Sequence, residues 1–395
     1  MRILFLTARF PWPLLRGDQL RAYHQLRLLA PRHRLTLVCF RHAPVPPEGV
    51  AAIAALCERV VTVPLGGVAM ATSLARGALS SLPFQVSLYR HARMRRVLGE
   101  LVAGETFDLA HTQLVRIAPY VEGFPAPRFV DLVDALSLSM RRRSHQHRGP
   151  LRWLTALEAE RLLRYERRIC ASVEGASVVS RVERDAIGAT ASVGVVPNGV
   201  DLGEFPFGRE GRDPATVVFT GNMGYFPNVN AACWFAERVH PLVRRSVPEA
   251  RFLVIGARPA ARVRRLARAD PPVGVLGFVD DLRPHLRSAT VAVAPMQAGA
   301  GQPFKMIEAM ASGTPVVATP VAAAAFEAGG GDGLLVAETP EAFAGAVVSI
   351  LRDPGRAGQL AAQARRLVES RHTWEGSTAH LEELYEAARS HRSTL

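Results

Sequence analysis

Residues 297–313 read QAGAGQPFKMIEAMASG, a glycine-rich loop that leads into an amphipathic segment. Lys305 lies at the start of that segment, one helical turn before Glu308, and it is the only lysine among the 48 basic residues. Glycines let backbone N–H groups approach an anion, and the N-terminus of a helix adds partial positive charge. An ammonium group is a compact charge, whereas a guanidinium is a wide fork. This stretch therefore predicts a phosphate and sugar site, with chance placement of the single lysine as the alternative.

Short apolar strands alternate with longer amphipathic segments along the chain, a pattern typical of parallel sheets covered by helices. A first series of strands is expected at residues 2–7, 35–40, 60–63, 108–111, 128–132, 177–179 and 193–196. A second series is expected at residues 217–220, 252–255, 273–276, 291–294, 315–318 and 334–336. The glycine- and proline-rich segment 197–208 lies between them and predicts an interdomain hinge. The expected fold class is α/β, with two doubly wound Rossmann-like domains that face a central cleft at the carboxyl ends of their strands.

The composition indicates a globular protein with two to three domains, because 395 residues that are 48% hydrophobic are ample for large cores. No apolar run is long enough to span a bilayer, and the opening apolar stretch 3–8 stops at Arg9, too early for a signal peptide. A cytoplasmic location is therefore expected. The four cysteines are scattered without the spacing of a zinc site or a disulfide framework, which predicts small buried side chains.

The formal net charge of +13 favours anionic partners. Between Ser139 and Cys170, nine arginines stand against three glutamates, beside an apolar stripe made of Leu151, Leu154, Leu157, Leu162 and Tyr165. A basic amphipathic helix can lie on an anionic membrane, so peripheral association with the inner membrane face is one expectation. The alternative is an ordinary surface helix whose stripe packs on its own domain. Nucleic acid is not an expected partner, because no aromatic residues interleave with the arginines.

Four segments carry a resemblance to a known family. They are residues 11–21 with Arg16-Gly17-Asp18, residues 196–201 (VPNGVD), residues 220–222 (TGN) and residues 305–319 (KMIEAMASGTPVVAT), the last being the most specific. Through them the chain resembles the retaining GT-B glycosyltransferases of family 4, most closely those of bacterial exopolysaccharide gene clusters, over nearly its whole length. The resemblance implies an acceptor-binding domain at residues 1–200 and a donor-binding domain at residues 201–374. It also implies a final helix at residues 375–395 that crosses back onto the first domain.

The resemblance further implies which residues bind the nucleotide diphosphate sugar. Glu308 would accept hydrogen bonds from the ribose hydroxyls, and Lys305 would hold the diphosphate together with N–H groups of the preceding loop. The implied donor-binding residues are Glu308, Gly221, Asn222, Gly299, Gly301, Gln302, Phe304, Phe278 and Val279. A surface ion pair for Glu308 and a purely structural turn at Gly221 are the alternatives.

On the acceptor side, the resemblance places Arg16, Gly17, Asp18 and Gln113 at the cleft. His111 joins Lys305 as a candidate catalytic residue, because a cleft histidine often follows this strand in the family. Gln113 occupies the family's usual second position. His111 is therefore either a ligand in the cleft or a core histidine at the end of its strand.

The chain departs from the family pattern at Ala300, where the family usually has a second glutamate, eight residues before Glu308. Contacts to the donor sugar must then come from backbone amides, Gln302 or the other domain. The identity of the sugar, of the base and of the acceptor stays open.

Other chemistries fit the sequence less well. There is no Asp-x-Asp element to hold a divalent cation, no Gly-x-Gly-x-x-Gly after the first strand and no Gly-x-Ser-x-Gly. The expected function is metal-independent, retaining transfer of a hexosyl unit to a glycan, a lipid-linked sugar or a natural product. No cofactor is expected beyond the nucleotide diphosphate sugar, which is a substrate. A GT-B epimerase or phosphorylase, and an inactive membrane-associated scaffold, remain the alternatives.

Overall fold

The computed structural model describes residues 1–67, 70, 73, 80–188, 193–268, 273–326 and 333–393. The chain forms two compact units. Unit 1 comprises Met1–Pro197 and Trp374–Leu395, and unit 2 comprises Asn198–Thr373. The first crossing between the units therefore follows Pro197 rather than residue 200, and the second follows Thr373 rather than residue 374.

Unit 1 contains one sheet of seven parallel strands in the order β3-β2-β1-β4-β5-β6-β7. The chain adds strands first on one side of β1 and then on the other, which makes the sheet doubly wound. The strands are β1 (Arg2–Thr7), β2 (Arg34–Arg41), β3 (Arg59–Pro64), β4 (Leu109–Gln113), β5 (Arg128–Val133), β6 (Gly175–Val178) and β7 (Val193–Val195). Strands β1, β2 and β4 are buried along nearly their whole length, because helices cover both faces of a parallel sheet.

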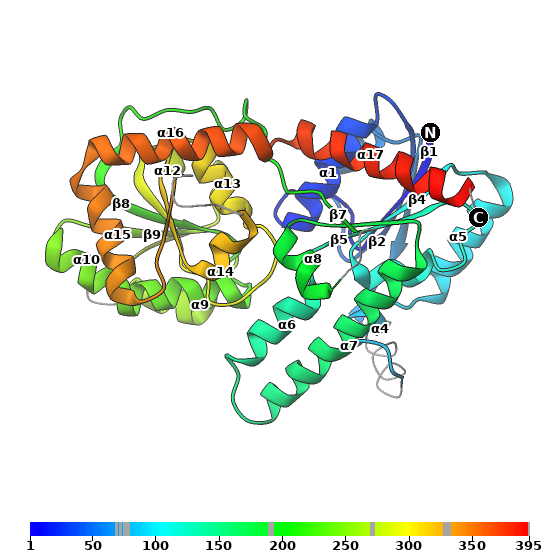
Figure 1. The fold of residues 1–395 in the computed structure, drawn as a ribbon, viewed down its shortest axis with the longest axis horizontal. Coiled ribbons are helices and arrows are strands. Elements are labelled where there is room, and N and C mark those ends of the chain that lie inside the picture. Colours follow the sequence, from blue (N-terminus) through cyan, green and yellow to red (C-terminus); the bar gives the residue numbers. More distant parts are fainter. Residues whose placement is uncertain are drawn as a thin grey trace. The chain divides into compact units, whose positions relative to one another are not determined.

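The helices of unit 1 connect these strands (Figure 1). They are α1 (Gly17–Leu29), α2 (Pro47–Ala54), α4 (Phe84–Ser87), α5 (Ala92–Gly104), the 3-10 helix η1 (Val115–Tyr120), α6 (Leu136–Ser144), α7 (Pro150–Ser172), α8 (Arg181–Ile187) and α17 (Trp374–Ser393).

Helix α17 belongs to unit 1 although it follows unit 2 in the sequence. Its Leu381 and Tyr385 lie in the same buried cluster as Phe5 and Phe129 of the sheet. Gly194 in β7 makes room for this helix, because a Cβ atom there would lie 2.4 Å from a methyl carbon of Leu384. The helix expected at residues 375–395 is thus described up to Ser393, and residues 394 and 395 lie outside the described residues.

Unit 2 contains a sheet of six parallel strands in the order β10-β9-β8-β11-β12-β13. The strands are β8 (Asp213–Thr220), β9 (Arg251–Ile255), β10 (Val273–Gly277), β11 (Ala289–Ala294), β12 (Val316–Ala318) and β13 (Leu334–Val336). The helices are α9 (Phe226–Trp234), the π-helix η2 (Phe235–Val239), α10 (His240–Ser246), α11 (Ala261–Leu266), α12 (Arg283–Ser288), α13 (Phe304–Ala311), α14 (Pro320–Ala323), the 3-10 helix η3 (Ala324–Phe326), α15 (Pro340–Arg352) and α16 (Pro354–Arg371).

Each strand expected from the sequence has a counterpart in one of the two sheets, so the prediction of two doubly wound sheets is confirmed. Several strands are longer than expected. For example, β8 begins at Asp213 because Asp213 pairs with Ala289 of β11, before the apolar run starts. Apolar residues mark the buried middle of a strand, whereas backbone pairing continues into its polar ends.

Among the described residues, no helix combines the length and the apolar content needed to cross a membrane.

Candidate active site

Glycines bring three loops of unit 2 together at the carboxyl edge of its sheet. The Gly221 N–H donates to the Ile255 carbonyl at 3.0 Å, and the Gly256 N–H donates to the Gly277 carbonyl at 2.7 Å. Gly221 and Gly256 have φ values of +143° and +149°, which residues with a Cβ atom rarely adopt. A Cβ atom on Gly256 would lie 1.7 Å from the Gly221 carbonyl oxygen. The loops after β8, β9 and β10 therefore stack backbone to backbone, and we call this the glycine edge.

Lys305 lies beside the glycine edge, in the first turn of α13. Its Nζ atom donates to Asn228 Oδ1 at 2.7 Å and lies 4.2 Å from the centre of the Phe219 ring. A Cβ atom on Gly221 would be only 2.9 Å from this Nζ, so the absence of a side chain there leaves room for the ammonium group. Burial lowers the pKa of Lys305 to about 7. Among the described residues Lys305 forms no ion pair, so its charge is available to an anionic ligand, although the Glu308 carboxyl one turn away opposes the fall in its pKa.

Glu308 follows Lys305 by one turn of α13. Burial raises the pKa of Glu308 to about 7, and the positive charge of Lys305 opposes that rise. No ion pair joins the two side chains in the described part of the chain. A carboxyl group held in this way can accept hydrogen bonds from a ligand once it is ionised.

The loop before α13 has the positive φ values that its glycines predict. Gly299 and Gly301 have φ values of +112° and +83°, and Pro303 at the N-cap of α13 provides no side-chain hydrogen bond to the helix. Phe304 starts the helix and is half-buried. Backbone N–H groups at such a helix start are suited to an anion.

Gln302 has a different place from the one expected. Its Oε1 accepts a hydrogen bond from the Asn198 N–H at 2.8 Å, and its Nε2 donates to the Ala325 carbonyl at 3.2 Å. The side chain is 4% exposed. Both ends of the amide therefore form hydrogen bonds inside unit 2. A contact between this side chain and a donor sugar would require these hydrogen bonds to break.

The remaining donor-side candidates lie at the same edge of the sheet. Asn222 shapes the turn after β8: its Oδ1 accepts from the Gly224 N–H at 3.0 Å, and its carbonyl accepts from Asn228 Nδ2 at 3.0 Å. Phe278 follows β10 and is 57% exposed, and Val279 beside it is half-buried. An exposed aromatic ring at this edge is available to contact a flat ligand.

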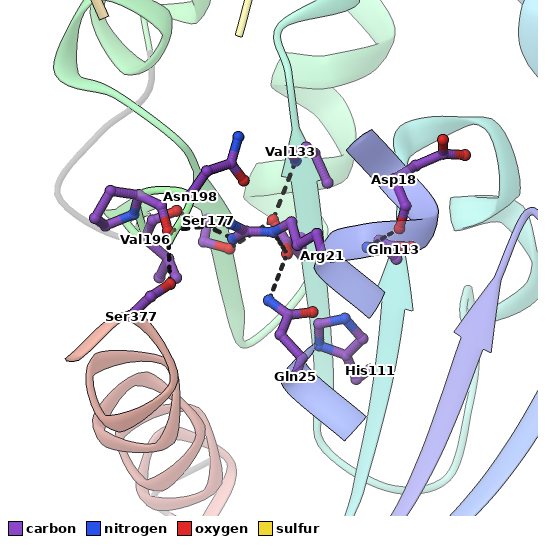
Figure 2. A network of polar contacts seen from close by, with 12 residues as sticks. Asp18, Arg21, Gln25, His111, Gln113, Val133, Ser177, Val196, Asn198 and Ser377 are labelled. Carbon is purple, nitrogen blue, oxygen red and sulfur yellow. Dashed lines mark hydrogen bonds and ion pairs between the residues drawn. The ribbon is translucent and has the colours of Figure 1, made fainter. Parts of the chain in front are cut away.

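In unit 1, the acceptor-side candidates lie at the carboxyl edge of the other sheet. Gln113, the last residue of β4, donates from Nε2 to the Asp18 carbonyl at 3.1 Å (Figure 2). The Asp18 carboxylate forms an ion pair with Arg9. Gly17 begins α1, directly after the exposed Arg16. The structure thus brings Asp18 and Gln113 together and places Gly17 and Arg16 beside them.

His111 is buried in the core of unit 1, which argues against the catalytic role expected for it. Strand β4 continues to Gln113 instead of ending at His111, so His111 lies inside the sheet and is 0% exposed. Its ring stacks on Phe5 with centroids 4.1 Å apart, and its Nδ1 lies 2.7 Å from the hydroxyl of Tyr385 in α17. Burial lowers the pKa of His111 to about 4, so the ring is neutral at physiological pH. This residue is the core histidine of the alternative interpretation.

Asp134 is a site candidate that the sequence analysis missed. It directly follows β5, at the same edge as Gln113 and Asp18. Burial raises the pKa of Asp134 to about 7, against the opposing charges of Arg116 and Arg21. A carboxyl group with a raised pKa at the carboxyl edge of a doubly wound sheet is a candidate functional group.

The backbone next to Asp134 is strained. Val133 and Leu114, which end β5 and follow β4, have φ values of +62° and +76°. Such values are costly for any residue with a Cβ, above all for a β-branched one. Strain of this kind concentrates at functional sites, and here it occurs at two neighbouring strand ends. A sequence pattern gives no signal for it, because neither residue is a glycine.

We expect Asp134→Asn to stabilise the protein at pH 8. An aspartate in the unfolded chain has a pKa near 3.9, so between about pH 4 and pH 7 the folded protein binds more protons, and stability falls as the pH rises. The variant removes this loss, which is at most about 4 kcal/mol at pH 8 for a rise of about three pKa units, and has little effect near pH 4. Thermal denaturation at both pH values measures the difference. Asp185→Asn, at an exposed carboxylate of α8, is the control. An unchanged or lower Tm of Asp134→Asn at pH 8 would contradict the assignment.

Asn228 is the second residue that the sequence analysis missed. It lies in the first turn of α9, where its amide links the Lys305 ammonium to the Asn222 carbonyl. The available signal was its place seven residues after Gly221, at the start of the helix that follows the glycine turn. A helix start after a strand in a parallel sheet is where ligand-positioning side chains gather.

The family of the donor-side unit follows from a direct match. Residues 214–353 match the family described as glycosyl transferases group 1. This segment contains the glycine edge, Asn228, Lys305 and Glu308. The chain contains a group 1 glycosyltransferase domain. For residues 214–353, the glycosyltransferase family expected from the sequence is therefore confirmed.

Relatives of the group 1 domain include characterised transferases. The chain is 30% identical over 254 residues to phosphatidyl-myo-inositol mannosyltransferase of Mycolicibacterium smegmatis, which covers 61% of this chain and 63% of that protein. It is 29% identical over 218 residues to glycogen synthase of Mycobacterium tuberculosis, which covers 50% of this chain and 49% of that protein. The chain thus matches less than two thirds of the length of either relative.

Solved structures with the same fold cover the whole chain. Sucrose-phosphate synthase from Thermosynechococcus elongatus covers 98% of the chain with a TM-score of 0.74 at 17% identity. Anabaena HepE in complex with UDP covers 98% with a TM-score of 0.68 at 15% identity. The GT-B fold class expected for the two sheets is confirmed, and the central cleft stays a prediction.

Proposed function

We propose that this chain is a retaining, metal-independent glycosyltransferase that moves a hexosyl unit from a nucleotide diphosphate sugar to an acceptor hydroxyl. The group 1 domain of unit 2 would bind the donor, and unit 1 would bind the acceptor. The observation that carries the proposal is Lys305, a cation held by Asn228 next to the side-chain-free Gly221, with Glu308 one turn further along α13.

The donor fits these residues in order along the edge of the sheet. The diphosphate would lie between Lys305 and the N–H groups at the start of α13, because both favour negative charge. The ribose hydroxyls would donate to the Glu308 carboxylate, and the base would lie toward Phe278. With Ala300 in the place of the second family glutamate, donor-sugar contacts in the loop fall to backbone amides.

The chemistry proposed for the transfer needs no protein nucleophile. The bond between the sugar C1 and the diphosphate oxygen breaks while the acceptor oxygen bonds to C1 from the same face. The acceptor proton passes to the leaving phosphate. Lys305 would stabilise the negative charge that develops on the leaving group, which is the largest contribution that a fixed charge can make.

Two relatives suggest which donor and which acceptor this chain uses. HepE was solved with UDP, which favours a uridine donor for this chain. The mycobacterial mannosyltransferase acts on phosphatidyl-myo-inositol, which favours a lipid-linked acceptor over a free glycan or a small natural product.

Calorimetric titration of the full chain with UDP, GDP and ADP tests the donor site. We expect one nucleotide to bind, and we expect Glu308→Gln to weaken it by about 1.5 to 3 kcal/mol, roughly 10- to 150-fold, because a hydrogen bond to a charged group is lost. The loss should be as large for the free nucleotide as for its sugar conjugate, since the ribose is common to both.

The matched control is Glu341→Gln, at an exposed glutamate in the first turn of α15. This variant is expected to bind as the wild type does. Equal affinity of wild type and Glu308→Gln would reject the ribose role. Binding of no nucleotide would reject the enzyme and favour an inactive scaffold, whereas turnover of the donor without acceptor would favour an epimerase or phosphorylase.

A further inference from the structure

Helices α6 and α7 form a hairpin that extends beyond the sheet of unit 1 (Figure 1). The turn of the hairpin comprises residues 145–149. Helix α7 has 23 residues, so it is about 35 Å long at 1.5 Å per residue. We call residues 141–157 the hairpin tip.

The half of α7 beyond the tip packs on unit 1. Leu162, Tyr165 and Ile169 are buried there, and the Glu158 carboxylate accepts hydrogen bonds from the N–H groups of Phe84 and Gln85 at 2.9 Å. This half of the expected amphipathic stripe therefore packs on its own domain, as the ordinary surface helix of the alternative interpretation would.

The first two turns of α7 carry large apolar side chains that the described residues leave exposed. Trp153 is 77% exposed, Leu154 55%, Leu151 48% and Leu157 43%. On a helix with 100° per residue these four side chains span about 160°, so they form one face. Scattered exposed leucines are ordinary, but four large apolar side chains within seven residues form a patch that indicates a binding surface.

The same tip carries a local excess of positive charge. From residue 139 to residue 157 the sequence has five arginines and no acidic residue, a formal charge of +5. Among the described residues, Arg141, Arg148 and Arg152 form no ion pair. Arg141 and Arg152 line a pocket of about 390 Å³ between α6 and α7, and Trp153 and Glu160 line it with them. The basic side chains thus border the apolar face.

We propose that the hairpin tip docks unit 1 onto an anionic lipid bilayer. The aromatic and leucine side chains would enter the boundary between headgroups and acyl chains, where tryptophan is favoured, and the arginines would contact lipid phosphates. A bilayer suits the tip better than a protein partner does, because arginines without an ion pair border the apolar face on a projecting element. This inference is independent of the transferase activity proposed above.

Flotation with vesicles of phosphatidylcholine, with and without about 30 mol % phosphatidylglycerol, tests the proposal. The wild type is expected to bind the anionic vesicles at low salt and to dissociate as salt rises. Trp153→Ser with Leu154→Ser should weaken binding about tenfold or more, since partial burial of two large side chains is lost. Arg141, Arg148 and Arg152 changed together to Gln should weaken it about 10- to 100-fold, on anionic vesicles alone.

The controls use exposed residues of the same types elsewhere. Val50→Ser on α2 matches the apolar change, and Arg264, Arg265 and Arg268 changed together to Gln match the loss of three charges. Both control variants should bind vesicles as the wild type does. In each protein that keeps Trp153 and binds, the fluorescence of Trp153 should shift to the blue on binding.

Three outcomes would overturn the proposal. They are absence of wild-type binding to anionic vesicles at low salt, equal binding by the tip variants and the wild type, and loss of a dimer in the Trp153 and Leu154 variant with unchanged vesicle binding. The last outcome would assign the apolar face to contact between copies of this chain. Thermal denaturation of each variant separates loss of binding from loss of folding.

Discussion

Lys305→Met is expected to lower kcat by about 100- to 1,000-fold, the usual cost of removing one preorganised charge from a developing anion. Methionine is the informative replacement because Lys305 is half-buried over the Phe219 ring, so an apolar chain of similar length keeps the packing. The folded state should therefore survive, and thermal denaturation checks this. Turnover of the sugar donor under saturating conditions is the measurement.

The pH dependence of nucleotide binding gives a second readout for Lys305. Burial lowers its pKa to about 7, so the charged form of the unliganded protein is lost as the pH rises through that value. A bound diphosphate favours the charged form, and affinity should therefore fall above pH 7, by at most about tenfold per pH unit. This dependence should be absent in Lys305→Met.

Lys305→Arg is the matched control for charge. It keeps the positive charge but replaces a compact ammonium by a wider group beside Gly221, so we expect activity between those of the wild type and Lys305→Met. Wild-type turnover in a folded Lys305→Met protein would exclude a role at the diphosphate.

Arg21→Met is expected to destabilise the protein by about 3 to 5 kcal/mol, the usual cost of leaving a buried charge without its partner. Arg21 and Asp131 are both 0% exposed, and the Arg21 Nε lies 2.7 Å from Asp131 Oδ2. Arg21 also donates to the Val196 and Pro197 carbonyls, at 3.0 and 3.2 Å (Figure 2). The guanidinium thus joins α1, β5 and the last residues of the first segment of unit 1. Urea denaturation measures the change.

A double variant tests whether the unpaired charge of Asp131 causes this loss of stability. Arg21→Met with Asp131→Asn removes both charges, so it should be less destabilised than Arg21→Met alone. Arg96→Met is the control, because Arg96 is 70% exposed and its contact with Glu100 is worth well under about 1 kcal/mol. A loss below about 1 kcal/mol in Arg21→Met would contradict the structural role.

The sign of the pH effect at Asp131 is also testable. Burial alone would raise the pKa of this carboxyl, but the charge of Arg21 lowers it overall. Its contribution to stability is therefore present above the unfolded pKa near 3.9 and lost as the pH falls through the lower folded value. Without Arg21, burial dominates and the ionised carboxylate becomes a penalty. The difference between wild type and Arg21→Met should therefore shrink on acidification.

The positions of the strands were predictable because each strand is marked by its own run of apolar residues. Runs such as residues 3–6 and 291–294 are apolar along their length, since a parallel strand is buried on both faces. The glycine loop before Lys305 was also predictable from the sequence, because Gly299 and Gly301 adopt positive φ values that a residue with a Cβ atom rarely takes. In both cases the chain itself carries the physical constraint.

The chemical state of the site residues depended on contacts between distant parts of the chain. His111 and Asp134 are both polar residues near the ends of neighbouring strands, so the sequence alone does not distinguish them. Tyr385, 274 positions away from His111, closes the core over the imidazole, whereas Asp134 lies at the edge among Arg116 and Asp18. Burial and neighbouring charges set accessibility and pKa, and both arise only when the fold brings remote side chains together.

The stripe of α7 was decided in the same way. The sequence determined that Leu151, Leu154, Leu157, Leu162 and Tyr165 share a helical face, because that follows from 3.6 residues per turn. Only the tertiary structure decided that Leu162 and Tyr165 are buried while Leu151, Leu154 and Leu157 are exposed. Helical periodicity fixes the direction in which a side chain points, but its burial depends on whether another element lies there. Over the first turns of α7 the described residues leave the apolar side chains 43% to 77% exposed.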